Sequence, residues 1–118
     1  MELRRKRAYD NASPEDGFRV LIDRLWPRGV SKERAAIDLW AKEVAPSPEL
    51  RHDWHAAPDA DFEVNAQRYR AELEAAPALQ ELVEELRGRP VVTLVYALHD
   101  TEHNHAVVLE RVLKPLLR

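Results

Sequence analysis

The sequence has no cysteine and little glycine. The missing thiols exclude disulfide bonds, a cysteine nucleophile and metal sites held by cysteine. The three glycines, at positions 17, 29 and 88, form no glycine-rich phosphate-binding loop. No run approaches the roughly 18 apolar residues of a membrane span. The N-terminal stretch MELRRKRAYD is charged, with no apolar segment behind it. We therefore expect a cytoplasmic protein with no membrane partner.

The length and composition predict one globular domain spanning residues 1–118. Apolar residues make up 45% of the chain and charged residues 33%. The net charge is −3, but residues 1–34 hold nine Lys or Arg against six Asp or Glu. This basic first third could attract an anion locally. It is weaker than the strongly basic surface typical of nucleic-acid-binding domains.

Hydrophobic patterning predicts strands at 2–9, 18–23 and 91–97, the last two buried on both faces. Helices are expected at 31–44, from about 47 to 54, from 61 to a break at Pro77, and from about 79 to Gly88. A last helix should start near 101–102 and end or kink at Pro115. Because helices separate the two strongest strands, we predict an α/β fold with a small, mostly parallel sheet and helices packed on it.

Two polar segments follow those two strands. Strand 18–23 ends in Asp23-Arg24 and leads into WPRGVSK, and strand 91–97 leads into HDTEHNH at 99–105. Ligands of open α/β sheets bind outside the carboxyl ends of the strands. If the two strands are parallel neighbours, both segments reach the same edge of the sheet. The sequence therefore predicts one shared polar site.

The basic side chains of the first segment suit an anion. Arg24, Arg28 and Lys32 lie close together beside a helix start capped by Ser31. Guanidinium groups and free backbone N–H groups at a helix start bind phosphate and other oxyanions. We add Asn104 of the second segment to this anion-binding set. The alternative is that these residues solvate a loop and pair with helix carboxylates.

Asp23 and His103 are the candidate catalytic residues. The expected helix start beside His103 disfavours imidazolium, and a neutral imidazole can accept a proton or polarise a carbonyl. Asp23 would orient this histidine or act as a second catalytic group; otherwise it forms a structural pair with arginine. Trp26, Tyr96 and Asp100 are expected to form walls of the pocket.

The remaining histidines leave an alternative open. His105 lies in the apolar stripe of the last helix, so we expect it to be buried with its hydrogen bonds satisfied. His99, His103 and His105, with Asp100 or Glu102, would be the ligands of an alternative metal site, although no HExxH-type motif occurs. The main hypothesis includes no metal ligand, and the sequence identifies no cofactor.

The two polar segments also carry a resemblance. DRLWPRGVSK at 23–32 and EHNHA at 102–106, with RAYD, DLW, APS and RY at 7–10, 38–40, 45–47 and 68–69, are similar to motifs of the YeaO-like family of small bacterial proteins, a domain of unknown function. The resemblance covers nearly the whole chain and implies a compact cytoplasmic α/β protein, but no reaction. Between residues 51 and 62, around His55, this sequence departs from the family pattern.

The leading functional hypothesis is a protein that binds, and as an enzyme would act on, an anionic small molecule or nucleotide at the strand-end site. One alternative is a nucleic-acid-associated regulatory module that uses the basic first third. The other is the histidine-based metal site. The sequence does not define the oligomeric state.

Overall fold

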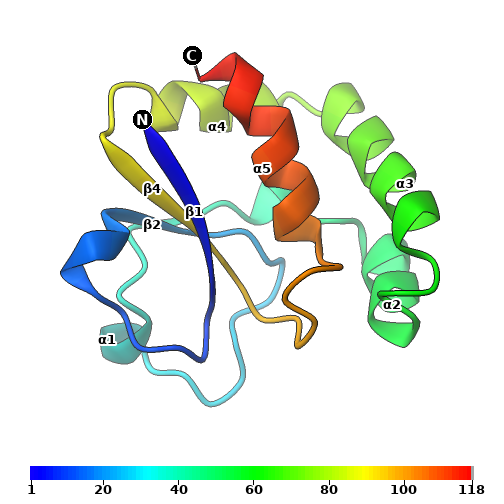
Figure 1. The fold of residues 1–118 in the computed structure, drawn as a ribbon, viewed down its shortest axis with the longest axis horizontal. Helices are drawn as coiled ribbons and strands as arrows, with labels where there is room; N and C mark the ends of the chain where they lie inside the picture. Colours follow the sequence, from blue (N-terminus) through cyan, green and yellow to red (C-terminus); the bar gives the residue numbers. More distant parts are fainter. Residues whose placement is uncertain (118) are drawn as a thin grey trace.

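The structure is a computed structural model and describes residues 1–117. Its centre is a four-stranded parallel sheet in the order β1-β4-β2-β3 (Figure 1). The strands are β1 (Glu2–Arg7), β2 (Phe18–Leu21), β3 (Leu39–Trp40) and β4 (Val91–Tyr96). Glu2 of β1 pairs with Val91 of β4, and Phe18 of β2 pairs with Val92. This confirms the predicted parallel α/β arrangement.

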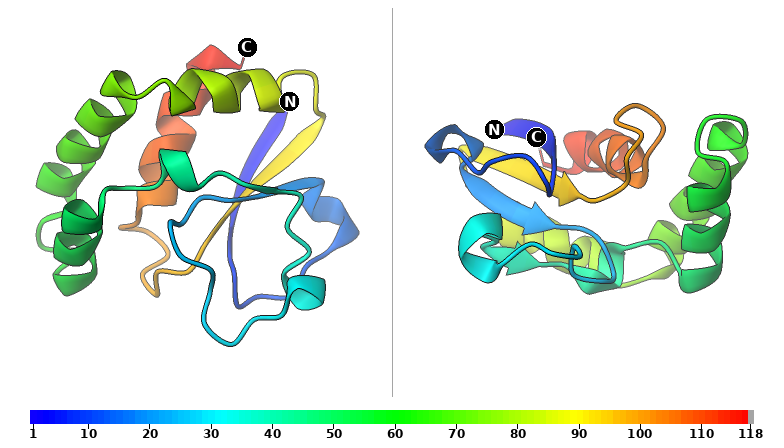
Figure 2. Two further views of the ribbon diagram at one scale, coloured as in Figure 1. Left: turned by 180° about the vertical axis from the view of Figure 1, so that it is seen from behind. Right: turned by 90° about the horizontal axis from the view of Figure 1, so that it is seen from below.

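The helices gather mainly beside one face of this sheet (Figures 1 and 2). They are α1 (Lys32–Ala35), α2 (Pro48–Ala56), α3 (Phe62–Ala75), α4 (Ala78–Leu86) and α5 (His105–Leu116), with 3-10 turns η1 (Pro14–Asp16) and η2 (Lys42–Val44). Helix α5 packs against β1 and β4, and α3 packs against α2 and α5. No helix within residues 1–117 is long and apolar enough to cross a membrane.

The two central strands are buried on both faces, as their unbroken apolar runs predict. Val20 and Ile22 enter the main core under the helices, while Leu21 between them points to the opposite face. In β4, Leu94 and Val95 divide in the same way. The side chains that cover the smaller cluster on the second face come from the loops and β3; they are Trp26, Ile37 and Trp40.

The predicted helix at 31–44 is wrong beyond its first turn. Ser31 does cap α1, but the helix ends at Ala35, and Ala36 turns the chain in the left-handed region at φ 47°. The Arg19 Nε–H of β2 donates to the Ala35 carbonyl, and the Arg19 backbone N–H donates to Asp38. These tertiary hydrogen bonds hold the chain along β2, so residues 39–40 form β3 instead of helix.

The last helix starts three to four residues later than expected. Asn104 is its N-cap, and its side chain accepts the Val107 N–H at 3.1 Å. Before it, the Asp100 carboxylate accepts the N–H groups of Glu102 and His103 at 2.9 Å each, a local turn that competes with helix. Pro115 lies inside the last turn of α5, where the helix continues to Leu116. The predicted strands and the other helices differ from the structure only at their ends.

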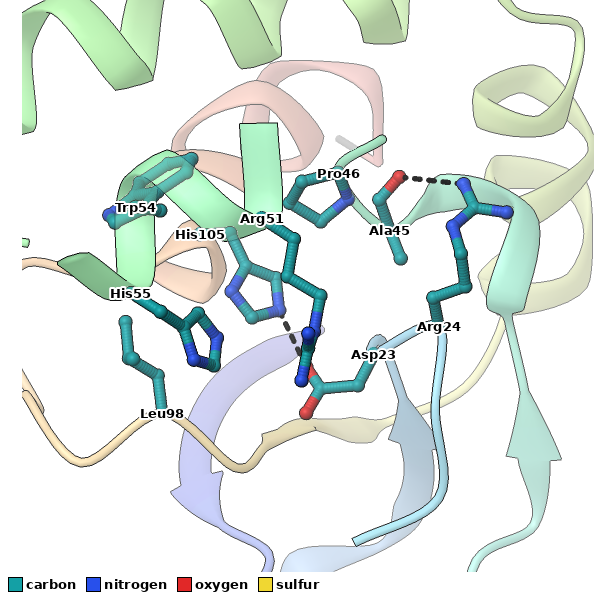
Figure 3. Close-up of a pocket in the computed structure, with 9 residues that line it drawn as sticks. All are labelled: Asp23, Arg24, Ala45, Pro46, Arg51, Trp54, His55, Leu98 and His105. Carbon is teal, nitrogen blue, oxygen red and sulfur yellow. Dashed lines mark hydrogen bonds and ion pairs between the residues drawn. The ribbon is translucent and has the colours of Figure 1, made fainter. Parts of the chain in front are cut away.

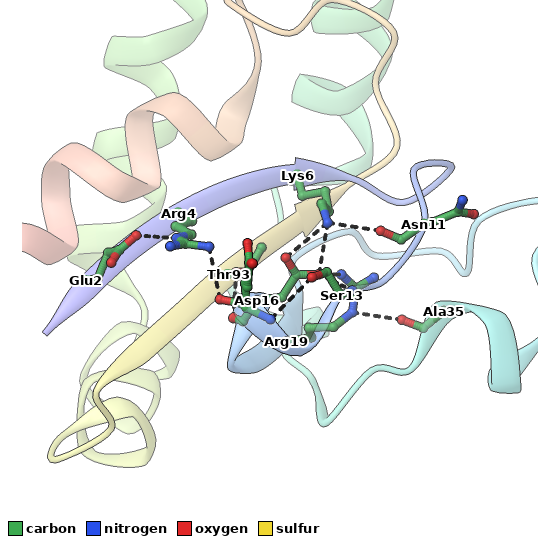
Figure 4. Close-up of polar contacts among 10 residues, drawn as sticks. Glu2, Arg4, Lys6, Asn11, Ser13, Asp16, Arg19, Ala35 and Thr93 are labelled. Carbon is green, nitrogen blue, oxygen red and sulfur yellow. Dashed lines mark hydrogen bonds and ion pairs between the residues drawn. The ribbon is translucent and has the colours of Figure 1, made fainter.

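A buried ion network joins β1, η1 and β2 (Figure 4). Asp16 and Arg19 are each 3% exposed, and their side chains meet at 2.6 Å. Lys6 of β1 approaches the same carboxylate at 3.0 Å, and the Thr93 hydroxyl donates to the Asp16 carbonyl. Burial raises the pKa of Asp16, but Lys6, the Ser13 N–H and Arg19 outweigh burial and hold that pKa below its usual range. The network therefore favours the ionised carboxylate.

Gly17, between η1 and β2, allows the chain to pass β4 closely. Its φ is +63°, and a Cβ there would meet the Val91 carbonyl oxygen and lie 2.7 Å from the Val91 Cβ. Backbone geometry and space both require glycine here. Gly88 also has a positive φ, +86°, but a Cβ there would meet nothing within 4 Å.

The substitution Gly17→Ala is expected to lower the free energy of unfolding by about 3 kcal/mol or more, because it adds a steric clash to backbone strain. Gly88→Ala adds strain alone and should cost about 1–2 kcal/mol. Urea denaturation of both variants measures the difference. Equal losses would contradict the close approach of Gly17 to β4.

The substitution Asp16→Asn is expected to cost about 3 kcal/mol at neutral pH, because it leaves the Arg19 charge buried without its counter-ion. The folded protein lowers the pKa of Asp16. The carboxylate therefore stabilises the fold above the unfolded pKa of about 3.9, and this contribution disappears as pH falls through the folded pKa. The difference between variant and wild type should shrink in acid. Glu15→Gln, at an exposed neighbouring acid, is the control and should stay within about 0.5 kcal/mol.

Candidate functional site

A cavity opens at the carboxyl ends of β2 and β4, where the second turn of α2 meets the start of α5 (Figure 3). It encloses about 310 Å³ outside the protein atoms, mouth included, and about 20 Å³ of this admits the centre of a water molecule. The inner part therefore holds about one water. The lining residues come from five segments; they are Asp23, Arg24, Ala45, Pro46, Arg51, Trp54, His55, Leu98 and His105.

The Asp23 carboxylate joins the elements around this cavity. One oxygen accepts a hydrogen bond from His105 Nε2 of α5 at 2.7 Å, and the other accepts the Ala97 N–H after β4 at 2.9 Å. Because an ionised carboxylate only accepts, Nε2 of His105 carries the proton. The Asp23 carbonyl accepts the Trp40 indole N–H of β3 at 2.7 Å. Asp23 thus connects the end of β2 to both neighbouring strands and to α5.

Two arginines bring positive charge to the cavity. Arg51 extends into it from α2, and Arg24 lies on the opposite side next to Ala45 (Figure 3). The buried Nε–H of Arg24 has no acceptor among residues 1–117, and its Nη2 reaches the Ala45 carbonyl only at 3.5 Å. Neither guanidinium forms an ion pair within the described chain. Asp23 is the one carboxylate among the lining residues, so two cations face one anion that is already hydrogen-bonded.

His55 lies four residues after Arg51, on the same face of α2. The residue is exposed at the cavity mouth, and the partial desolvation of its imidazole there lowers its pKa, as does the positive charge of Arg51. Near neutral pH the imidazole is therefore uncharged. A neutral imidazole at the cavity offers one donor and one acceptor to a bound group.

Helix α2 is fixed in place by polar contacts at both ends. Ser47 caps it by accepting the Leu50 N–H, and the Ser47 hydroxyl donates to Glu72 of α3 at 2.6 Å. Trp54, 1% exposed, donates its indole N–H to the His103 carbonyl at 2.7 Å. These contacts hold Arg51 and His55 against the strand ends.

Of the residues predicted to bind an anion, the structure places only Arg24 at the cavity. Arg24 lines the cavity, whereas Arg28 and Lys32 are exposed on the following loop and at the start of α1 and do not line it. Trp26, expected as a wall, lies on the other side of the sheet. Its ring meets the Trp40 ring edge-on, and its indole N–H donates to Val30. The loop folds this way because its apolar residues cover the second face of the sheet.

The second segment contributes His105 to the cavity, and its other predicted residues lie outside. His103 pairs with Asp100 and Asp59 at 3.1 and 3.3 Å and stacks edge-on against Phe62. Asp23 is therefore paired with His105 and not with His103. Asn104 serves as the N-cap and donates to the Asp100 carbonyl at 2.9 Å. Helix α5 begins at His105 rather than at 101–102, which turns His105 toward the strand ends.

Tyr96 and Asp100 are likewise outside the cavity lining. Tyr96 is 3% exposed, and its ring meets His105 edge-on at 6.4 Å between centroids. Burial raises the pKa of its phenol, and Arg5 and Arg7 partly offset this. Asp100 accepts two backbone N–H groups, and these bonds lower the pKa of its carboxyl. Tyr96 thus packs against the His105 ring, and Asp100 stabilises the turn before α5.

The histidine-based metal hypothesis gains no geometric support. Residues 1–117 contain no group of three or more His, Asp or Glu arranged to hold a metal ion. His99 is exposed, His105 faces Asp23, and the two nitrogens of His103 face different carboxylates.

Most cations of the basic first third are engaged inside the molecule. Lys6 and Arg19 share Asp16, and Arg4 pairs with Glu2. Arg5 approaches Glu110, Arg7 donates to the carbonyls of Ala97 and Leu98, and Arg34 donates to the Tyr9 carbonyl. Nucleic-acid binding by this segment stays a prediction, and these contacts do not favour it.

Sequence reasoning missed Arg51 and His55 as site residues and treated His105 as structural except in the alternative metal site. A signal was present, since Arg51 lies in the helix predicted at 47–54 and His55, four residues on, follows directly after it; a helix that continues through His55 places both on one face. That signal does not show which part of the sheet the helix contacts.

Comparison with known proteins identifies the family. A family model described as "Inactive DUF488-N3 subclade" matches residues 2–118. The chain belongs to this family. The chain is also 39% identical to the uncharacterised protein YeaO of Escherichia coli over 116 residues, 98% of this chain and 100% of YeaO. This confirms the YeaO-like resemblance.

Two mycobacterial relatives are similar over almost as much of the chain. Uncharacterised proteins of Mycobacterium tuberculosis and Mycobacterium bovis are each 44% identical over 111 residues, 94% of this chain and 92% of the relative. No solved structure matches this DUF488-N3 protein. The comparisons thus give a family and no activity.

The substitution Arg51→Gln is expected to raise the pKa of His55, because it removes the positive charge that opposes imidazole protonation in the cavity. NMR titration of the His55 ring measures this. In the wild type the His55 pKa should lie below the usual value of about 6.5. Arg87→Gln, at the far end of α4, is the control and should leave the His55 titration unchanged. No change in Arg51→Gln would contradict the placement of the two side chains.

Proposed function

We propose that this DUF488-N3 protein binds an anionic small molecule in the cavity between α2 and the ends of β2 and β4. The carboxylate or phosphate of the ligand sits between Arg24 and Arg51. His55 contributes a neutral hydrogen-bonding group at the same cavity.

The observation that carries this proposal is the unbalanced charge of the cavity. Asp23, its one carboxylate, is hydrogen-bonded through both oxygens to His105 and Ala97. The Nε–H of Arg24 is buried and has no acceptor in the part of the chain that the structure describes. A buried donor without a partner costs about 1–3 kcal/mol, and an anion that accepts this N–H recovers the cost. Guanidinium groups also match the planar geometry of carboxylate and phosphate oxygens.

The size of the cavity limits what enters it. Its inner space holds about one water molecule, so one oxygen of the carboxylate or phosphate occupies it and the rest of the ligand lies in the mouth, near His55. A compact carboxylate or a phosphate monoester satisfies this limit. A nucleotide meets the same limit with one phosphate oxygen inside and its sugar and base in the mouth and beyond it.

Binding without turnover suits these residues better than catalysis. Asp23 is occupied in joining three elements, and its partner His105 is 6% exposed. His103, the other expected acid–base group, faces Asp59 and Asp100 outside the cavity. The description of the family as an inactive subclade supports the same reading.

The test is NMR titration with inorganic phosphate, acetate and a nucleoside monophosphate, following the Trp54 indole and His55 ring signals. Arg51→Gln is expected to weaken binding by about ten- to a hundredfold, because it removes a charge-assisted hydrogen bond worth about 1.5–3 kcal/mol. Arg28→Gln removes the same charge from the exposed loop and should change the affinity less than about twofold, as expected of a screened surface charge.

Three outcomes are informative. A loss of anion affinity in Arg51→Gln but not in Arg28→Gln supports binding in the cavity. An equal loss of anion affinity in the two variants would indicate that the anion binds outside the cavity, at the loop around Arg28, and would contradict the proposal. The absence of saturable binding of all three anions by the wild type would overturn the proposal.

A further inference from the structure

A second hollow lies between the β3–η2 segment and α4, lined by residues other than those of the candidate site. It is an open groove that encloses about 920 Å³ outside the protein atoms, mouth included. Figure 2 shows α4 running beside η2, and the two elements pack together. The groove shares no lining residue with the cavity, so it stands independently of the proposed function.

The floor of the groove is apolar. Val44 and Leu82 are buried at 2% and 3% exposure, and Leu39 of β3 is half-buried along one wall, while Trp40 borders the groove at the edge of the sheet with its ring toward the other face. Lys42 is the one basic residue of the lining, and its ammonium lies over the Trp40 ring at 4.0 Å from the centroid. Such a surface can take an apolar side chain of a partner.

The rim of the groove is acidic. Glu43, Glu81 and Glu85 line it, and none forms an ion pair within residues 1–117. Helix α4 contains no Lys or Arg, and Glu84, which does not line the groove, has Arg87 as its partner. Glu81 and Glu85 are four apart on α4, so their like charges repel on one helix face. A cation placed between them would relieve this repulsion.

Strand β3 supplies a backbone edge beside the groove. In the described chain it pairs with β2 alone and forms one margin of the sheet. An edge strand presents unpaired N–H and C=O groups to an added strand, and extended peptides bind many proteins in this way.

We infer that the groove between β3 and α4 docks an extended, cationic segment of a partner protein. The segment lies alongside β3, with its Lys or Arg side chains on Glu43, Glu81 and Glu85 and an apolar side chain on Leu39 and Leu82. A second copy of this chain placed by two-fold symmetry would bring the same three carboxylates against one another, which disfavours it as the occupant.

The test uses a labelled eight-residue peptide of alternating lysine and valine and fluorescence anisotropy. The double variant Glu81→Gln, Glu85→Gln is expected to weaken binding about tenfold, because it removes two of the charge pairs that hold the peptide at a solvent-screened surface. The matched control is Glu63→Gln, Glu74→Gln, which makes the same charge change on exposed positions of α3 and should bind like the wild type. Arg51→Gln should also bind like the wild type.

Two further peptides separate strand addition from charge attraction. A backbone-N-methylated version keeps the charge but cannot pair with β3, so it should bind at least about tenfold more weakly. An alternating glutamate–valine peptide should not bind. Equal binding of the N-methylated and parent peptides, or equal binding by the α4 and α3 double variants, would overturn the inference.

Sedimentation velocity of the wild type tests whether a second copy of this chain occupies the groove. A monomer is expected across the micromolar range. A dimer that the substitutions Glu81→Gln and Glu85→Gln strengthen would overturn the inference and assign the groove to a second copy.

Discussion

One carboxylate holds together the part of this molecule where its sheet and helices meet. Asp23 accepts hydrogen bonds from the loop after β4 and from the first residue of α5, while its own carbonyl receives the Trp40 indole. The ends of three parallel strands and one helix are thus fixed relative to one another by a single residue. The cavity beside Asp23 has an excess of positive charge for this reason. The carboxylate is hydrogen-bonded to His105 and Ala97 and forms no ion pair with Arg24 or Arg51.

The apolar runs of the sequence were sufficient to predict the two central strands of the sheet. The pattern at 18–23 and 91–97 predicted buried parallel strands, and alternate residues of both do enter clusters on opposite faces. The failure at 31–44 has a physical cause. The spacing of Ala36, Leu39, Trp40 and Val44 fits a helix, but Leu39 and Trp40 instead face opposite sides of the sheet. Hydrogen bonds from Arg19 stabilise the strand over the helix. They join residues far apart in the sequence, so no local pattern predicts them.

The candidate site was predictable to the extent that it depends on strand ends. Asp23 and Arg24 were placed by that rule and do line the cavity. Arg51 and His55 were not, because their position depends on how α2 docks through Ser47, Glu72 and Trp54. The sequence predicted that His103 would pair with Asp23, whereas His105 does so, for a similar reason. The turn made by Asp100 delays the start of α5, and this decides which imidazole faces Asp23.

The strand order has a consequence for how the chain acquires its structure during synthesis. β4 is the central partner of both β1 and β2, yet it is the last strand to be made, and Glu2 pairs with Val91. While the ribosome translates the first ninety or so residues, β1 has no strand to pair with. Contacts so distant along the chain slow folding. The nascent N-terminal strand therefore remains unpaired until most of the polypeptide has emerged, and its dense positive charge protects it from pairing with other chains meanwhile.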